Sequence, residues 1–277
     1  METLIDLSKY EKSGEGANGS SYNSLVDPNE MIKLYDRGFS EEMIRLELEM
    51  AKKVYDLNIP SPRPGELVTD GKRLGIRFWR IPNKKSFARA IADDPANAEK
   101  YVREFARMCK ELHQVKCEPG YFPDAKEQFY GFLETDTTFN AEEKQKIANY
   151  IKAVPDSCTA LHGDMHIGNA VTDGKKNYFI DLGCFSCGYP LFDLGMMYII
   201  TMINGEEFTY ENFHIHADFA RTLWPYFADE YFGHGANLQE VEQKVLPFVA
   251  IKSLLIGRTV GFLFPYFEDI FRKTILK

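Results

Sequence analysis

The chain has 277 residues and an ordinary globular composition, with 44% hydrophobic and 27% charged residues, which is enough for one large domain or two smaller ones. Its net charge of −8 argues against nucleic acid as the main partner. The longest apolar run, residues 194–203, is too short to cross a bilayer. The first residues lack the pattern of a positive charge followed by an apolar run, so no secretory signal is expected. Five cysteines without a framework spacing favour reduced thiols and a cytoplasmic location.

Residues 1–80 are predicted to form strands with one helix. Strands over residues 4–12 and 20–25 flank a glycine-rich turn, and residues 31–35 alternate like a further strand. Ser40 is a suitable N-cap for a helix over residues 41–57. The apolar stripe expected on that helix comprises Met43, Leu46, Met50 and Val54. Asp70-Gly71 predicts a hairpin between strands at residues 66–68 and 74–80.

Beyond residue 80 the pattern becomes mainly helical. Asp94-Pro95 predicts the start of a helix that ends near His113, and Asn140 predicts the start of another that ends before Pro155. Short strands are expected at 170–172 and 177–180, joined by a turn at Asp173-Gly174. Helices rich in aromatic residues are expected from Leu191 onward, and these aromatic side chains are expected to form the core. The predicted fold class is therefore α+β, with a small antiparallel β-sheet lobe over residues 1–80 and a larger, mostly helical lobe over residues 81–277.

Residues 14–19 read GEGANG, a glycine spacing that recurs where a backbone comes close to phosphate. A dinucleotide-binding fold would need a helix directly after this turn and an acidic residue about 20 positions on, where Asp36 lies nearby. Asp27-Pro28-Asn29 leaves no room for that helix. A hairpin over the phosphates of ATP fits better, and it predicts a phosphate-binding lysine held by a glutamate, for which Lys33 and Glu47 are suitably placed.

Two later stretches are rich in oxygen ligands. Residues 161–169 read LHGDMHIGN, and residues 179–183 read FIDLG. Asn169 and Asp181 offer the hard oxygen atoms that Mg²⁺ prefers, which leaves Asp164 to accept a hydrogen bond from an attacking hydroxyl. His162, Asp164 and His166 could instead be ligands of a metal-dependent hydrolase. That alternative explains neither the glycine hairpin nor Lys33.

Cysteine and histidine positions allow a second alternative, a zinc or redox site. Cys184 and Cys187 have a Cys-x-x-Cys spacing, and Cys109, His113 and Cys117 would share one helical face. The second Cys-x-x-Cys of a zinc ribbon is absent from the sequence, and free cysteines commonly serve as small buried hydrophobes. We therefore expect these thiols to lie in the core.

The order of these motifs resembles the aminoglycoside phosphotransferase and choline kinase family, whose fold is similar to that of protein kinases. The family pattern H-G-D-x-x-x-x-N, followed by a hydrophobic-I-D-x-G strand end, is matched by His162, Gly163, Asp164, Asn169, Ile180, Asp181 and Gly183. Gly188, Pro190 and Asp193 continue it. Together with GEGANGSSY, Lys33 and Glu47, the resemblance covers roughly residues 10–195.

The resemblance implies a two-lobed, ATP- and Mg²⁺-dependent phosphotransferase. Asp164 would be the catalytic acid-base residue, Asn169 and Asp181 would bind magnesium, and Lys33, held by Glu47, would contact the ATP phosphates. The remaining residues implied to bind the nucleotide are Gly16, Ala17, Asn18, Gly19, Ser20 and Ser21 of the hairpin, Phe78, Trp79, Arg80 and Ile81 of the hinge, and Ile180. The hinge departs from the family pattern, because it reads RIPNKKS where an acidic residue and glycine are common.

The acceptor is expected to be a hydroxyl of a small molecule. Residues 181–277 carry 7 basic and 12 acidic side chains, a net charge of −5, which favours an amine-bearing acceptor such as an aminoglycoside or amino alcohol. Candidate contacts, each also readable as a surface charge, are Asp218, Asp229, Glu230, Glu268 and Asp269. A nucleotide-binding regulator without transfer activity is the main alternative. A protein kinase is disfavoured because only four residues separate Gly183 from Gly188. A monomer or homodimer is expected.

Overall fold

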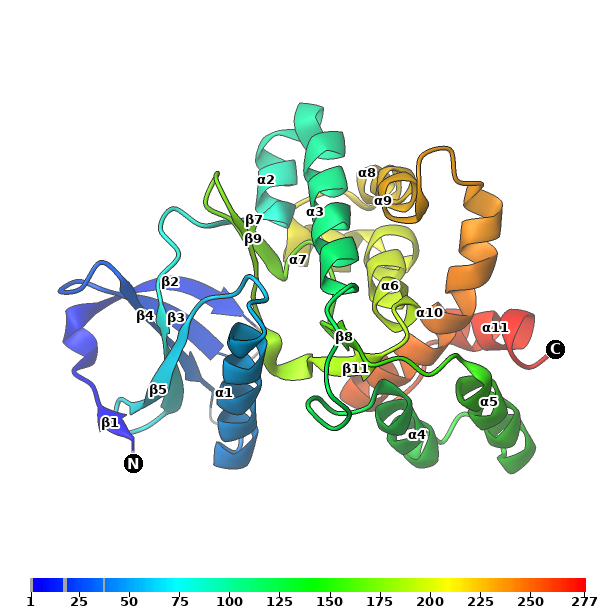
Figure 1. Ribbon diagram of the computed structural model, residues 1–277, viewed down its shortest axis with the longest axis horizontal. Helices are drawn as coiled ribbons and strands as arrows, with labels where there is room; N and C mark the ends of the chain where they lie inside the picture. The colour runs from blue at the N-terminus through cyan, green and yellow to red at the C-terminus, as the bar shows by residue number, and fades with distance from the viewer. Residues whose placement is uncertain (1, 17–18, 37) are drawn as a thin grey trace. The chain divides into compact units, whose positions relative to one another are not determined.

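The chain folds into two compact units in a computed structural model that describes residues 2–16, 19–36 and 38–277 (Figure 1). The first unit contains the residues up to Lys85 together with Ala170–Cys184, and the second contains Ser86–Asn169 and Phe185–Lys277. The sequence instead predicts that all residues after 80 belong to one lobe. Residues 170–184 depart from that prediction because they are hydrogen-bonded to the first unit, where the Phe179 N–H donates to the Pro60 carbonyl at 2.8 Å.

A six-stranded sheet forms the first unit, in the spatial order β1-β5-β6-β4-β3-β2. Its strands are β1 (Thr3–Leu4), β2 (Tyr10–Gly16), β3 (Gly19–Ser24), β4 (Glu30–Tyr35), β5 (Pro64–Thr69) and β6 (Leu74–Trp79). All neighbouring pairs are antiparallel except β1 and β5, which are parallel. The strand expected over residues 4–12 is interrupted by a 3-10 turn, Leu7–Lys9, because the Asp6 carboxylate accepts a hydrogen bond from the Ser8 N–H.

The predicted helix of this unit is α1 (Glu41–Asp56), and the Ser40 hydroxyl caps it by accepting the Met43 N–H. It packs against β5 and β6. The predicted apolar stripe is only half right, because Met50 and Val54 are buried whereas Met43 and Leu46 are each 51% exposed. The buried face is centred about one residue further along, and its remaining members are Ile44, Leu48 and Ala51.

Four further elements complete the first unit or adjoin it. The hairpin expected at Asp173-Gly174 joins β9 (Ala170–Thr172) to β10 (Asn177–Phe179), in antiparallel register. A 3-10 turn, η3 (Leu182–Cys184), follows and packs against α1. The short strand β7 (Lys85–Ser86) lies where the chain passes from the first unit into the second.

The second unit is mainly helical. Its helices are α2 (Phe87–Asp93), α3 (Ala98–Leu112), α4 (Ala125–Thr135), α5 (Ala141–Ala153), α6 (Leu191–Tyr198), α7 (Glu206–Phe213), α8 (Ala217–Arg221), α9 (Leu223–Phe232), α10 (Leu238–Val260) and α11 (Pro265–Thr274). A π-helical turn, Ile199–Ile203, extends α6, and β8 (Thr159–Leu161) pairs with β11 (Ser186–Gly188). None of the described helices is long and apolar enough to span a bilayer.

In the second unit, a helix begins at the predicted residue where that residue makes a side-chain capping hydrogen bond. Asn140 and Glu143 form the reciprocal capping box that begins α5, as predicted. Asp94, by contrast, makes no side-chain capping bond; it precedes only a 3-10 turn, Pro95–Asn97, and α3 begins after it. Neither α2 nor α4 is among the helices expected from the sequence.

The longest of the described helices, α10, packs against α4, α6, α9 and α11. Gly195 of α6 makes this packing possible, because an added Cβ would lie 2.6 Å from the Phe248 carbonyl oxygen of α10. The aromatic residues of this region are core, as expected, at Trp224 and Phe227. Phe262, at 56% exposed, and Tyr266, at 42% exposed, are exceptions at the surface.

Candidate active site

Lys33 is held between two carboxylates within the first unit. Its Nζ lies 2.9 Å from Glu47 Oε1 of α1 and 3.0 Å from Asp181 Oδ1, which follows β10. Burial favours the neutral amine, but the charges and hydrogen bonds of Asp181 and Glu47 outweigh burial and raise the pKa of Lys33. The structure thus brings together three residues that are implied to bind phosphates and metal, and it keeps Lys33 cationic.

Asp181 has an unusual backbone conformation, with φ at 60° in the left-handed region. Non-glycine residues rarely adopt it, and such outliers concentrate at functional sites. Here it occurs between β10 and the η3 turn, whose Gly183 lies against Glu47. The turn therefore directs the Asp181 carboxylate at Lys33.

Asp164 and Asn169 meet in the loop of the second unit that precedes β9. The Asn169 Nδ2 donates to the Asp164 backbone oxygen and to its Oδ2, each at 2.9 Å. Because the amide nitrogen is used in this way, Asn169 Oδ1 faces away from Asp164 and is available as an oxygen ligand. The loop thus holds the Asp164 carboxylate and the Asn169 amide oxygen in different directions.

His166 contributes to the charge of Asp164. Its Nδ1 accepts the Gly168 N–H at 3.0 Å, so the proton lies on Nε2, which is 3.5 Å from Asp164 Oδ2. Burial would raise the pKa of Asp164, but His166, followed by Lys252 and His162, lowers it below the ordinary range. Asp164 is therefore ionised at neutral pH.

A buried carboxylate, Asp193, fixes the start of this loop. Its Oδ2 accepts the His162 N–H at 2.7 Å, and its Oδ1 accepts the Gly163 N–H at 2.8 Å. His113 Nε2 lies 3.1 Å from Oδ2, and the other ring nitrogen of His113 bonds the Tyr231 hydroxyl. Burial opposes ionisation, but His113 reverses that effect and lowers the pKa of Asp193. Nothing in the sequence pattern predicts the contact between Asp193 and His113.

The glycine hairpin is described on both sides of its tip. Gly16 pairs with Gly19, and Ser20 and Ser21 pair with Leu34 and Lys33 of β4, whereas the implied contacts Ala17 and Asn18 lie outside the described residues. A Cβ on Gly19 would lie 2.2 Å from the Leu34 carbonyl oxygen, at a φ of 150°. Glycine is thus required there by close backbone approach.

The hinge residues are placed less favourably for adenine than the resemblance implies. The Trp79 N–H donates to the Arg63 carbonyl at 2.9 Å, and the Arg80 N–H donates to the Asn29 carbonyl at 2.7 Å. Phe78 pairs with Met31 inside the sheet. Two hinge N–H groups already donate within the first unit. The backbone contact to adenine that the resemblance implies would therefore have to come from the Ile81 N–H or from hinge carbonyl groups.

The alternative metal sites are not formed by the described residues. Among them, no group of three or more His, Cys, Asp or Glu is arranged to hold a metal ion. Cys109, Cys117 and Cys187 are buried, as expected of core thiols, whereas Cys184 is exposed. His113 is bonded to Asp193 rather than directed to the thiols.

Four of the five candidate acceptor contacts are engaged in ion pairs. Asp218 pairs with Arg221, Glu268 with Arg272, and both Asp229 and Glu230 with Arg103. Asp218 and Asp269 are exposed, whereas the Glu230 side chain is only 13% exposed. The alternative that the acids are surface charges is therefore favoured at Asp218 and Asp269.

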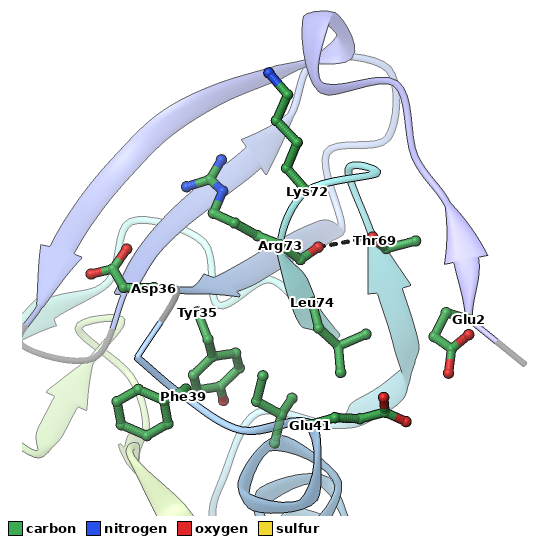
Figure 2. Close-up of a pocket in the computed structure, with 10 residues that line it drawn as sticks. Glu2, Tyr35, Asp36, Phe39, Glu41, Thr69, Lys72, Arg73 and Leu74 are labelled. Carbon is green, nitrogen blue, oxygen red and sulfur yellow. Dashed lines mark hydrogen bonds between the residues drawn. The ribbon is translucent and has the colours of Figure 1, made fainter.

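A cavity of about 650 Å³ lies in the first unit, beside the start of α1 (Figure 2). Figure 2 shows the rings of Tyr35 and Phe39 side by side, and Lys72 and Arg73 projecting from the β5–β6 hairpin. Its lining residues are Glu2, Tyr35, Asp36, Phe39, Glu41, Ile44, Thr69, Lys72, Arg73 and Leu74. None of them is a residue implied to bind the nucleotide.

A comparison with protein-family models identifies the family of the chain. Residues 24–228 match the family model described as the phosphotransferase enzyme family. No curated protein sequence matches the chain. A choline/ethanolamine kinase family protein from Mesorhizobium loti superposes with a TM-score of 0.57 at 14% identity, covering 96% of this chain and 85% of that one.

Two antibiotic kinases are similar in structure as well. The amicoumacin kinase hAmiN, in complex with AMP-PNP and Ca²⁺, has a TM-score of 0.58 at 12% identity and covers 99% of this chain and 88% of its own. The aminoglycoside phosphotransferase APH(3'')-Id from Streptomyces rimosus, with ADP and streptomycin, has a TM-score of 0.56 at 16% identity and covers 88% and 92%. The family predicted from the motifs is confirmed. The chain belongs to the phosphotransferase enzyme family and has the kinase-like fold of these small-molecule kinases.

Proposed function

We propose that the protein transfers the γ-phosphate of ATP to a hydroxyl of a small molecule, with a divalent metal ion. The observation that carries this proposal is the position of Lys33 between Glu47 and Asp181, because these residues lie 14 and 148 positions away in sequence. A largely buried lysine charge in the middle of a strand is costly unless it is paired, and the two carboxylates offset that cost. We infer that the charge is kept in order to bind the phosphates that β2 and β3 cover.

Asn169 Oδ1 and Asp181 would hold the metal ion. Both are hard oxygen ligands, and Mg²⁺ usually combines one or two protein groups with phosphate oxygens and water, which fits a site that offers one amide oxygen and one carboxylate. When bound, the ion neutralises charge on the phosphates. Lys33 adds a second positive charge, and the hairpin N–H groups orient the phosphate chain.

Asp164 would orient the acceptor hydroxyl. Its lowered pKa makes it a weak base, so it accepts the hydrogen bond of the hydroxyl first and takes the proton as the bond to phosphorus forms. Asp193 keeps the loop in place through its bonds to two consecutive backbone N–H groups. Positioning and charge therefore account for the chemistry that this chain supplies.

An amine-bearing acceptor fits the net charge of −5 in residues 181–277. The similar structures include a complex with streptomycin and kinases described for choline and amicoumacin, which support the same class. The free thiols and the use of ATP suit a cytoplasmic enzyme.

The test is an ADP-release screen against aminoglycosides, amino alcohols and sugars. Asp164→Asn should lower turnover about 10²–10⁴-fold while leaving nucleotide affinity within about twofold. Asp181→Asn should instead weaken the metal-dependent binding of an ATP analogue. Equal turnover by Asp164→Asn and wild type would show that the assignment is wrong.

Two outcomes of this screen point to other functions. ATP binding without any phosphorylated product would favour a nucleotide-binding regulator. Labelled phosphate that appears in proteins rather than in small molecules would indicate a protein kinase.

A further inference from the structure

Lys252 is a buried lysine that the proposed mechanism has not used. It lies in the middle of α10 and is only 3% exposed. Ile251, directly before it, and Leu254, two positions after it, are core residues. Burying an ammonium group among apolar side chains is costly unless it is paired and hydrogen-bonded. A partner that repays this cost is therefore expected next to its Nζ.

That partner belongs to the loop that carries Asp164. The Lys252 Nζ donates a hydrogen bond to the Gly163 carbonyl oxygen, and it lies 5.9 Å from the centre of the Phe129 ring. Its positive charge also contributes to the lowered pKa of Asp193. Lys252 thus faces the backbone directly before Asp164 and compensates a buried carboxylate.

The hydrogen bond from Lys252 acts on Gly163, the residue directly before Asp164. Gly163 has a positive φ of 79° and no side chain, so rotation about its own backbone bonds decides where Asp164 points. Asp193 holds the peptide group before Gly163 through the Gly163 N–H at 2.8 Å. Lys252 holds the peptide group after Gly163 through the carbonyl. The two contacts together fix both sides of the glycine.

We propose that Lys252 is a positioning residue for phosphoryl transfer, which holds the Gly163–Asp164 peptide so that the Asp164 carboxylate meets the acceptor hydroxyl. This inference rests on the proposed function. Lys252 bonds the loop rather than any residue implied to bind the nucleotide. Its loss should therefore reduce kcat and spare the KM for ATP, and displacing a reacting group by about 1 Å commonly costs about 10²-fold in rate.

The experiment compares Lys252→Met with Lys244→Met. Both changes remove a lysine charge from α10, but Lys244 is exposed two turns earlier. Lys252→Met should lower kcat about 10²-fold, with the KM for ATP within about twofold, and Lys252→Arg should recover at least about tenfold of that loss. Lys244→Met should match wild type. A kcat of Lys252→Met within about threefold of wild type, or a KM for ATP that rises as much as kcat falls, would overturn the proposal.

Two further measurements keep the test decisive. If Lys252→Met does not fold, Lys252→Gln takes its place, because it keeps a donor but loses the charge and the reach; the same kcat and KM criteria apply. Hydrogen exchange of the backbone amides at residues 162–166 in the free protein reports the contact without any turnover. Faster exchange in the variant supports the contact, and unchanged exchange overturns it, even if wild type shows no acceptor-dependent ADP release and the proposed function fails.

Discussion

Replacing Asp193 by asparagine tests how the loop before Asp164 is held. The carboxylate accepts two backbone N–H groups at 2.7 and 2.8 Å and faces His113 at 3.1 Å. Asparagine has one carbonyl oxygen, so its NH₂ group must face one of these donors and leave it unpaired. A buried unpaired donor costs about 1–3 kcal/mol, and each lost charge-assisted bond costs about 1.5–3 kcal/mol. We therefore expect Asp193→Asn to lower the free energy of unfolding by about 3–4 kcal/mol.

The effect should depend on pH in a defined direction. The pKa of Asp193 is lower in the folded protein than its ordinary value of 3.8, so its stabilisation is present above that value and is lost as pH falls through the folded pKa. Asparagine does not titrate. The difference in stability between wild type and Asp193→Asn should thus be complete at pH 7 and shrink only below about pH 4.

Urea unfolding followed by circular dichroism, at pH 7 and at steps down to pH 3, measures both quantities. Asp218→Asn is the control, because that side chain is 99% exposed and should change stability by less than about 0.5 kcal/mol. A loss at pH 7 as small as that of the control would refute the assigned hydrogen bonds. A large loss that stays the same down to pH 3 would refute the assigned charge.

Three more results are expected. Gly195→Ala should lower the free energy of unfolding by about 1–3 kcal/mol in urea, because its Cβ would lie 2.6 Å from a backbone oxygen of α10. The control, Gly131→Ala in α4, has nothing within 4 Å of the added Cβ and should raise the free energy of unfolding by about 0.5–1 kcal/mol. Equal effects of the two changes would contradict the packing of α6 on α10. Glu47→Gln should raise the KM for ATP about tenfold, since one charge-assisted bond to Lys33 is worth about 1.5–3 kcal/mol, and an unchanged KM would show that the pair is not needed. The folded protein should react with Ellman's reagent at the two exposed thiols, Cys158 and Cys184, and at the three buried thiols only after unfolding; fast reaction of all five would contradict the buried positions.

Features encoded by neighbouring residues could be predicted from the sequence. The Ser40 cap, the Asn140 capping box and the turn at Asp173-Gly174 depend on groups only two or three positions apart. Where the local signal is weak, prediction fails. The helix α4 has an internal glycine and a low-contrast pattern, and the exposed Leu46 of α1 looks as apolar as a core residue. Burial there is decided by which face meets the sheet.

The candidate site shows the same limit at longer range. Lys33 and Asp181 are 148 positions apart, so only the motif resemblance, and not spacing, could associate them. The roles of Asp193 and Lys252 were missed because both depend on contacts between distant elements. The available signal was chemical: each is a single charge within an apolar run, residues 191–203 and 248–255. Such a charge indicates a buried partner but not its identity.

The left-handed backbone at Asp181 affects stability and activity differently. Holding a residue with a side chain at a φ of 60° costs about 1 kcal/mol, a cost that glycine avoids. Asp181→Gly would relax the turn and yet remove the oxygen atoms that Lys33 bonds. For stability, the relaxed turn is offset by the loss of a partner of the Lys33 charge. For catalysis, the loss of the carboxylate has no such offset, so a search for active variants would reject the change. The strained conformation of this single residue is thus retained for the carboxylate that it presents.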